Sequence, residues 1–100
     1  MTVAEKISME NVNHPGRVVR VDADKYNAVR DAIFSVLPSN APGLTLAELK
    51  EAIRPLIPDA IFPEGFKASW WMMGVQLDLR AKKLIATEKS KSLRLYRSAT

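Results

Sequence analysis

Leu77-Asp-Leu-Arg-Ala-Lys-Lys-Leu-Ile-Ala86 is the stretch of sequence that decides the fold. Upstream of it, and in its first half, apolar residues recur at the three- and four-residue spacing of a helix face. From Ile85 the pattern changes, because Ile85 and Thr87 alternate with Ala86 and Glu88 in the two-residue period of a strand. We therefore predict a helix from about residue 67 or 69 to 83 that leads directly into a β-strand. Its inward face is expected to carry Ala68, Met72, Val75, Gln76 and Leu79.

A second alternating run follows this strand. The polar segment Lys89-Ser-Lys-Ser92 separates it from Leu93-Arg-Leu-Tyr-Arg97, where leucines again alternate with other residues. Two such runs joined by a short polar tip are typical of a β-hairpin. The chain is therefore expected to end in a hairpin.

Two helices are predicted before this point. The first covers about residues 24–37, with Asp22 or Asp24 at its N-terminus and Pro38 at its end. The second begins after Thr45, which forms a capping-box pattern with Glu48. Because Pro55 disfavours helical geometry before it, this helix either ends near Ile53 or bends there. A short strand is possible at Leu44, and residues 55–66 form a long, proline-rich connection.

The N-terminal residues carry weaker signals. Asn11, Asn13 and the pair Pro15-Gly16 disfavour regular structure, so residues 1–15 are interpreted as an arm. The β-branched run Arg17–Val21 is compatible with a short strand. The folded domain is expected to span residues 16–98.

The order of these elements resembles that of a winged helix, which has three helices and a C-terminal β-hairpin wing. We therefore predict a single α+β domain of winged-helix type. The runner-up is another small α+β domain with the same elements packed differently. In winged-helix folds the residue that corresponds to Lys83 is often glycine, so the lysine predicts a different exit from the third helix.

The chain also resembles a family of short bacterial proteins of unknown function. The resemblance covers nearly the whole chain and implies a single domain, but no activity, substrate or catalytic residue. It rests on Asn11-Val-Asn-His-Pro-Gly-Arg17, Val21-Asp22, Lys25-Tyr26, Gly43-Leu-Thr45, Phe62-Pro63, Trp70-Trp71 and Val75-Gln-Leu-Asp-Leu79.

Composition disfavours most enzymatic and metal chemistry. The chain has no cysteine and one histidine, His14, so a zinc site would need carboxylates for every other ligand. The sequence contains no Gly-rich phosphate loop and offers His14 no partner that would indicate a nucleophile and base. We therefore expect no catalytic residues, no metal, no cofactor and no enzymatic activity. A substrate pocket near His14 and Arg17 is the least favoured alternative.

Location is predicted from two further features. Met1–Met9 lacks the apolar core of a signal peptide, and the apolar run Trp70–Val75 is too short to cross a bilayer. A cytoplasmic protein without a membrane partner is the expectation.

Positive charge gathers near the C-terminus. From Asp78 onward seven basic and two acidic side chains give a net charge of +5, whereas the first 77 residues carry −1. Such asymmetry favours an anionic partner, and DNA bound through the wing is the first functional hypothesis. Its candidate residues are Lys82, Lys83, Lys89, Lys91, Arg94 and Arg97.

The outer face of the third helix favours a different partner. It carries Trp70, Met73, Gly74, Leu77 and Ala81, a poor set for reading base edges and a good set for hydrophobic contact. Trp70, Met73 and Leu77 are the candidate interface residues. The N-terminal arm, a homodimer or another protein could cover them. The alternative hypothesis is therefore an interaction or dimerisation module that binds no nucleic acid.

Overall fold

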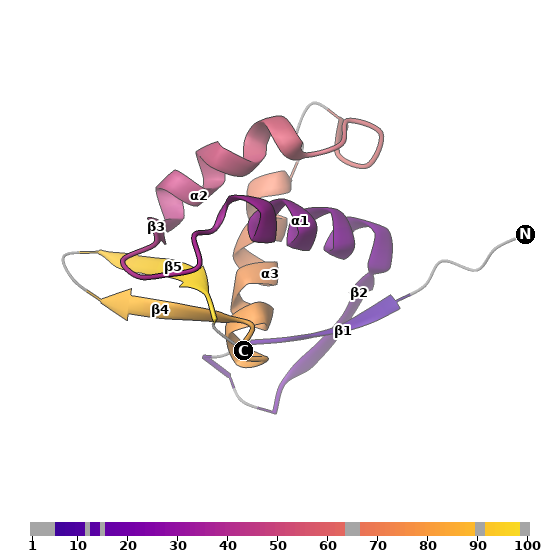
Figure 1. The fold of residues 1–100 in the computed structure, drawn as a ribbon. Helices are drawn as coiled ribbons and strands as arrows, with labels where there is room; N and C mark the ends of the chain where they lie inside the picture. The colour runs from indigo at the N-terminus through magenta and orange to yellow at the C-terminus, as the bar shows by residue number, and fades with distance from the viewer. Residues whose placement is uncertain (1–5, 12, 15, 64–66, 90–91, 99–100) are drawn as a thin grey trace, which may run out of the picture.

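The computed structural model describes residues 6–11, 13–14, 16–63, 67–89 and 92–98. Along the chain, these residues form strands β1 and β2, helix α1, strand β3, helix α2, a 3-10 turn η1, helix α3 and strands β4 and β5 (Figure 1). Their bounds are β1 Lys6–Glu10, β2 Val18–Asp22, α1 Ala23–Val36, β3 Leu44–Thr45, α2 Leu46–Ile53, η1 Arg54–Leu56, α3 Ala68–Ala81, β4 Ile85–Lys89 and β5 Leu93–Arg97. The result is a small α+β fold with three α-helices and two antiparallel sheets in the described part of the chain.

Helix α1 begins where the sequence predicts. The Asp22 side chain is its N-cap and accepts a hydrogen bond of 3.0 Å from the backbone N–H of Asp24, satisfying one of the free amides of the first turn. The helix buries Tyr26, Val29 and Ile33 against the core. It ends one residue earlier than predicted, two residues before Pro38.

Helix α2 has the predicted capping box. Thr45 Oγ1 accepts from the Glu48 N–H at 3.1 Å, and Glu48 Oε1 accepts from the Thr45 N–H at 2.9 Å. This backbone hydrogen bond holds the pKa of Glu48 below its ordinary value. Of the two alternatives left by Pro55, the structure takes the first: α2 ends at Ile53, and η1 follows with the proline at its start.

The second sheet has the strand order β3-β5-β4. Its hairpin β4–β5 has the predicted bounds within one residue and pairs Thr87 with Leu95. The same leucine faces Leu44 of β3 and is fully buried. Gly43 precedes β3 with φ of 81°, and a Cβ there would lie 2.0 Å from the Leu95 carbonyl oxygen, so this close approach requires glycine.

Helix α3 crosses the middle of the molecule between the two sheets (Figure 1). It buries Trp71, Met72, Val75 and Leu79 in the core. The Trp71 ring meets Phe62 edge to face, with ring centroids 6.2 Å apart. Met72, Val75, Gln76 and Leu79 are buried as predicted, and Ala68 is partly buried.

The exit of α3 corrects the prediction made for Lys83. Lys83 has φ of 62° and takes up the left-handed conformation that glycine favours, so the lysine does not change the exit. The Leu84 N–H donates to the Leu79 carbonyl at 2.9 Å and the Lys83 N–H to Arg80 at 3.1 Å. These two bonds form a Schellman motif, which stabilises a left-handed residue despite its side chain.

The N-terminal segment also differs from the prediction. Residues 6–10 form β1 within the range interpreted as an arm, and Ile7 pairs with Val21 of β2. Met9 lies against α3, where its methyl carbon would be 3.0 Å from a Cβ on Gly74. Strand formation here depends on contacts with residues far along the chain, which local sequence patterns do not contain.

Candidate interaction surface

One face of α3 carries a row of residues that the core leaves uncovered. We call Trp70, Met73, Gly74 and Leu77 the α3 stripe, because their spacing places them on one side of the helix. Trp70 is 63% exposed and Met73 is 41% exposed, whereas the adjacent Trp71 is 8% exposed. The two indole rings meet edge to face at 5.7 Å. Trp70 is therefore the tryptophan that remains open to solvent.

The β1–β2 hairpin covers part of this stripe. Met9 and Val19 from the hairpin and Gly74 and Leu77 from α3 line a pocket of about 310 Å³. The other lining residues are polar: Glu10, Asn11, His14 and Arg17. Of the three expected covers, the N-terminal segment thus reaches the Gly74–Leu77 end, while Trp70 and Met73 stay exposed.

The other end of the stripe borders a second hollow. Lys25 of α1 and Lys67 join the two tryptophans around a space of about 250 Å³. The α3 stripe therefore runs from an aromatic and basic hollow to a pocket with both apolar and polar lining residues.

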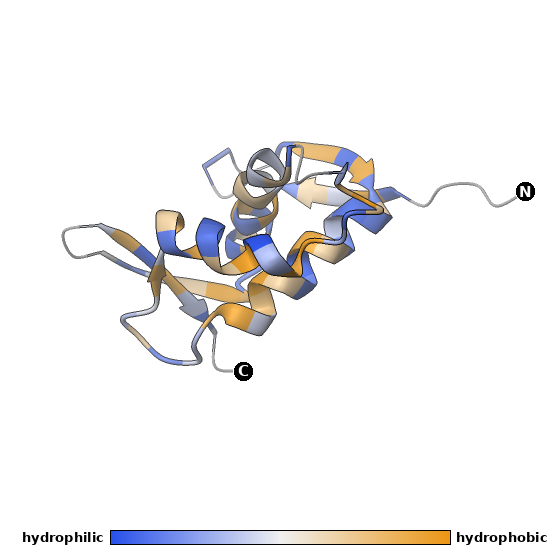
Figure 2. Ribbon diagram, turned by 90° about the horizontal axis from the view of Figure 1, so that it is seen from above, coloured by the Kyte–Doolittle hydropathy of each residue, from blue (hydrophilic) through white to orange (hydrophobic). Residues whose placement is uncertain are grey.

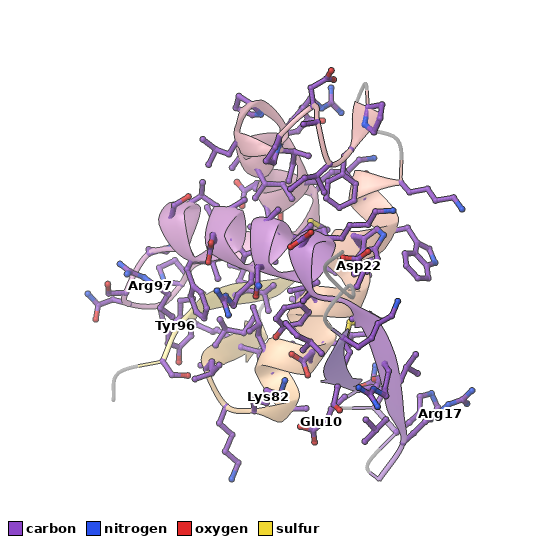
Figure 3. The ribbon with its side chains drawn as sticks, turned by 90° about the vertical axis from the view of Figure 1, so that its right-hand side faces the viewer. Glu10, Arg17, Asp22, Lys82, Tyr96 and Arg97 are labelled. Carbon is purple, nitrogen blue, oxygen red and sulfur yellow. The ribbon has the colours of Figure 1, made fainter. Side chains whose placement is uncertain are left out.

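A buried charged cluster joins the hairpin to the helices. Asp78 is fully buried, and its carboxylate accepts hydrogen bonds from the Glu10 N–H at 2.8 Å and from the Tyr26 hydroxyl. Lys82 Nζ lies 2.9 Å from the same carboxylate and donates to the Ser8 carbonyl at 3.2 Å. We call these groups the Asp78 cluster. Figure 3 shows Lys82 beside Glu10, where the end of α3 meets β1.

The cluster also affects Tyr26. Burial raises the pKa of the Tyr26 hydroxyl well above its ordinary value, and its hydrogen bond to Asp78 adds to that rise. Lys82 Nζ lies 5.5 Å from the centre of the Tyr26 ring. The Tyr26 hydroxyl and the Lys82 ammonium both bind the Asp78 carboxylate, so their role here is structural.

Sequence reasoning missed this cluster. In the sequence Asp78 stands as an acidic residue within a basic segment, but it lies three residues after Val75 and seven after Trp71, both on the buried face. That spacing was the available signal. Its partners Glu10 and Tyr26 are 68 and 52 residues away, and no local pattern identifies them.

The predicted basic residues do not form one open surface. Lys82 pairs with Asp78; Arg94 bonds to the Gly43 carbonyl at 3.0 Å and to Glu48 at 3.3 Å. Arg97 Nε donates to the Leu37 carbonyl at 3.1 Å and Nη2 to Ser39 Oγ at 2.7 Å.

The remaining predicted cations differ in what the structure describes. Lys83 is exposed. Lys91 and the side chain of Lys89 lie outside the described residues. Gln76, which was expected on the inward face, is 1% exposed and donates to the Met73 carbonyl.

The described residues contain no cluster of three or more histidine, cysteine, aspartate or glutamate side chains able to hold a metal. They also contain no helix long and apolar enough to span a bilayer.

These features define a small α+β domain in which the Asp78 cluster holds the β1–β2 hairpin against helix α3. Residues 6–95 match the Family of unknown function (DUF6958), and the chain belongs to this family. Comparison with curated proteins and with solved structures gives no match.

Proposed function

We propose that this protein is an interaction module on a winged-helix scaffold, and that the α3 stripe binds a segment of another protein. The scaffold assignment is supported by the order of α1, β3, α2, α3 and the β4–β5 hairpin, with β3 pairing against β5. In DNA-binding domains of this type, the third helix enters the major groove. Here the β1–β2 hairpin packs against that helix, so its access to a groove is restricted.

The observation that carries the proposal is the exposure of Trp70 and Met73 on the α3 stripe, whose Gly74–Leu77 end lines a preformed pocket. Tryptophan and methionine are enriched at protein interfaces, because they supply large contact areas on adaptable or rigid side chains. The four residues of the α3 stripe are uncharged and offer no ion pair to phosphate.

A photo-crosslinking amino acid at position 73 tests the proposal. The matched control carries it at Glu51, which is exposed on α2. A chain captured at position 73 and not at 51 is identified, purified and titrated against wild type, Met73→Asp and Glu51→Ala. We expect Met73→Asp to weaken binding at least tenfold and Glu51→Ala to leave it unchanged. Equal capture at both positions, or equal affinity of both variants, contradicts the proposal.

DNA binding by the β4–β5 hairpin is the second candidate function. It is supported by the net charge of +5 after residue 77 and by the exposure of Lys83. If Lys83, Lys89 and Lys91 each contact one phosphate, the logarithm of the binding constant should fall with the logarithm of the salt concentration with a slope of about −2.7. Lys89→Ala with Lys91→Ala should reduce that slope by about 1.8, while Arg94 is left intact because it anchors Glu48. Unchanged binding in the double variant excludes the hairpin as the contact.

A further inference from the structure

We propose that the partner binds as an extended strand along the free edge of β2, with acidic and apolar residues alternating. This inference rests on the proposed function and specifies its partner. It begins from the two edges of the β1–β2 sheet, which differ in how their backbone groups are satisfied.

The outer edge of β1 is closed by the end of α3. Its outward N–H at Glu10 donates to Asp78, and its outward carbonyl at Ser8 accepts from Lys82. Two side chains of the Asp78 cluster thus occupy the positions that a neighbouring strand would use. A third strand cannot add there without displacing Lys82 and Asp78 from these backbone groups.

No described residue covers the outer edge of β2 in this way. Within the described residues β2 pairs with β1 alone, and Ser8 lies opposite Arg20 while Glu10 lies opposite Val18. Two residues that lie opposite each other in an antiparallel pair direct their backbone N–H and C=O groups either toward each other or both outward, away from the partner strand. Because Ser8 and Glu10 point outward from β1, Val18 and Arg20 point outward from β2. Their N–H and C=O groups form a template for another strand.

Side chains beside this edge specify the partner. On the inner face Val19 is 49% exposed and lines the pocket with Leu77, so apolar residues of an added strand would lie there. On the outer face Arg20 is exposed, and Arg17, just before the strand, is exposed beside the pocket that Val19 lines. Figure 2 shows β2 as a hydrophobic strand interrupted by one hydrophilic band, and Figure 3 shows Arg17 pointing away from the body of the protein. A strand that alternates apolar residues with glutamate or aspartate complements both faces.

A second copy of this chain fits the edge less well. A two-fold pairing of β2 with its own copy would gather the exposed Arg17 and Arg20 of both chains on one short ribbon, whichever register the strands adopt. Like charges held close together repel, whereas acidic residues of another segment would be attracted to them. The charge of this edge therefore favours an acidic segment from another protein over self-association.

A synthetic peptide tests the inference. The probe is a blocked heptapeptide in which three valines alternate with two glutamates, with serine at both ends. Titration into labelled full-length protein should shift the Val18 and Arg20 amide resonances and slow their hydrogen exchange. The same peptide with lysine replacing glutamate should bind at least tenfold more weakly, and one methylated on alternate amides should not bind.

Variants of the protein give the decisive comparison. Arg20→Glu should lose at least tenfold in affinity for the glutamate peptide and gain affinity for the lysine peptide, while Lys50→Glu on α2 makes the same charge change without effect. Equal binding of both peptides by wild type overturns the inference, as does absence of binding or light scattering that reports a dimer paired through β2.

These results also separate the inference from the proposed function. If the captured partner loses affinity in Met73→Asp but not in Arg20→Glu, strand addition is wrong and the proposed function stands. If neither substitution changes the affinity of the partner, both are wrong.

Discussion

Replacing Asp78 with alanine is expected to lower the free energy of unfolding by about 1–3 kcal/mol, because it leaves the buried Tyr26 hydroxyl without its partner. The substitution removes the acceptor of the Tyr26 hydroxyl and of the Glu10 amide. Tyr26 is 3% exposed, and a buried polar group left without a partner costs about 1–3 kcal/mol. Lys82 loses less, because its side chain is 31% exposed and keeps the Ser8 carbonyl.

The assay is urea unfolding followed by circular dichroism, together with hydrogen exchange of the Glu10 amide. Since domains of this size are typically stable by about 5–15 kcal/mol, the loss should be large but measurable. Asp78→Asn, which keeps the shape and one acceptor, should lose less stability and serves if the alanine variant does not fold. Asp31→Ala, on the exposed part of α1, is the control and should change stability by less than about 0.5 kcal/mol. A loss below about 1 kcal/mol in Asp78→Ala, with unchanged protection of the Glu10 amide, would refute this account of the cluster.

Three further predictions follow from single residues. Because folding raises the pKa of Tyr26, the folded state keeps this proton after the unfolded chain has lost it. The free energy of unfolding should therefore fall as pH rises above about 10, with a slope of up to about 1.4 kcal/mol per pH unit. This fall should be present in wild type and in the control Tyr96→Phe and absent in Tyr26→Phe. Equal pH dependence in all three proteins would contradict this. Lys83→Gly should raise stability by up to about 1 kcal/mol, since it relieves a left-handed lysine at the end of α3, and a lower melting temperature would count against that reading. Trp70→Phe leaves the buried Trp71, so its fluorescence should be blue-shifted and weakly quenched by iodide. Trp71→Phe leaves the exposed Trp70, so its fluorescence should be red-shifted and strongly quenched. Similar quenching of both variants would show that the two rings do not differ in burial.

Much of the fold was predictable from short-range patterns. The capping box of Thr45 and Glu48, the stop of α1 before Pro38 and the period change at Ile85 each involve residues within a few positions of one another. The physical effects behind them, backbone capping and side-chain periodicity, act over the same short distances. The interface candidates followed from the same periodicity, and the structure leaves Trp70 and Met73 exposed on one face of α3.

Which basic side chains form internal hydrogen bonds was decided by tertiary structure. Seven basic side chains after residue 77 indicate a positive segment, but Arg94 and Arg97 bond to groups 46 to 60 residues away. Net charge is additive along the sequence, whereas the availability of each charge depends on the neighbours that folding brings to it. This is why composition could indicate an anionic partner without showing which cations are engaged internally.

The sequence by itself determined the helices, the C-terminal hairpin and the apolar face of α3, because each depends on residues close together in the chain. Tertiary structure alone decided that residues 6–10 form a strand, that Asp78 closes its outer edge, and that β2 pairs with β1 alone in the part of the chain that the structure describes. A strand edge is satisfied or left unpaired by whatever folding places beside it, and here the covering groups come from the opposite end of the chain.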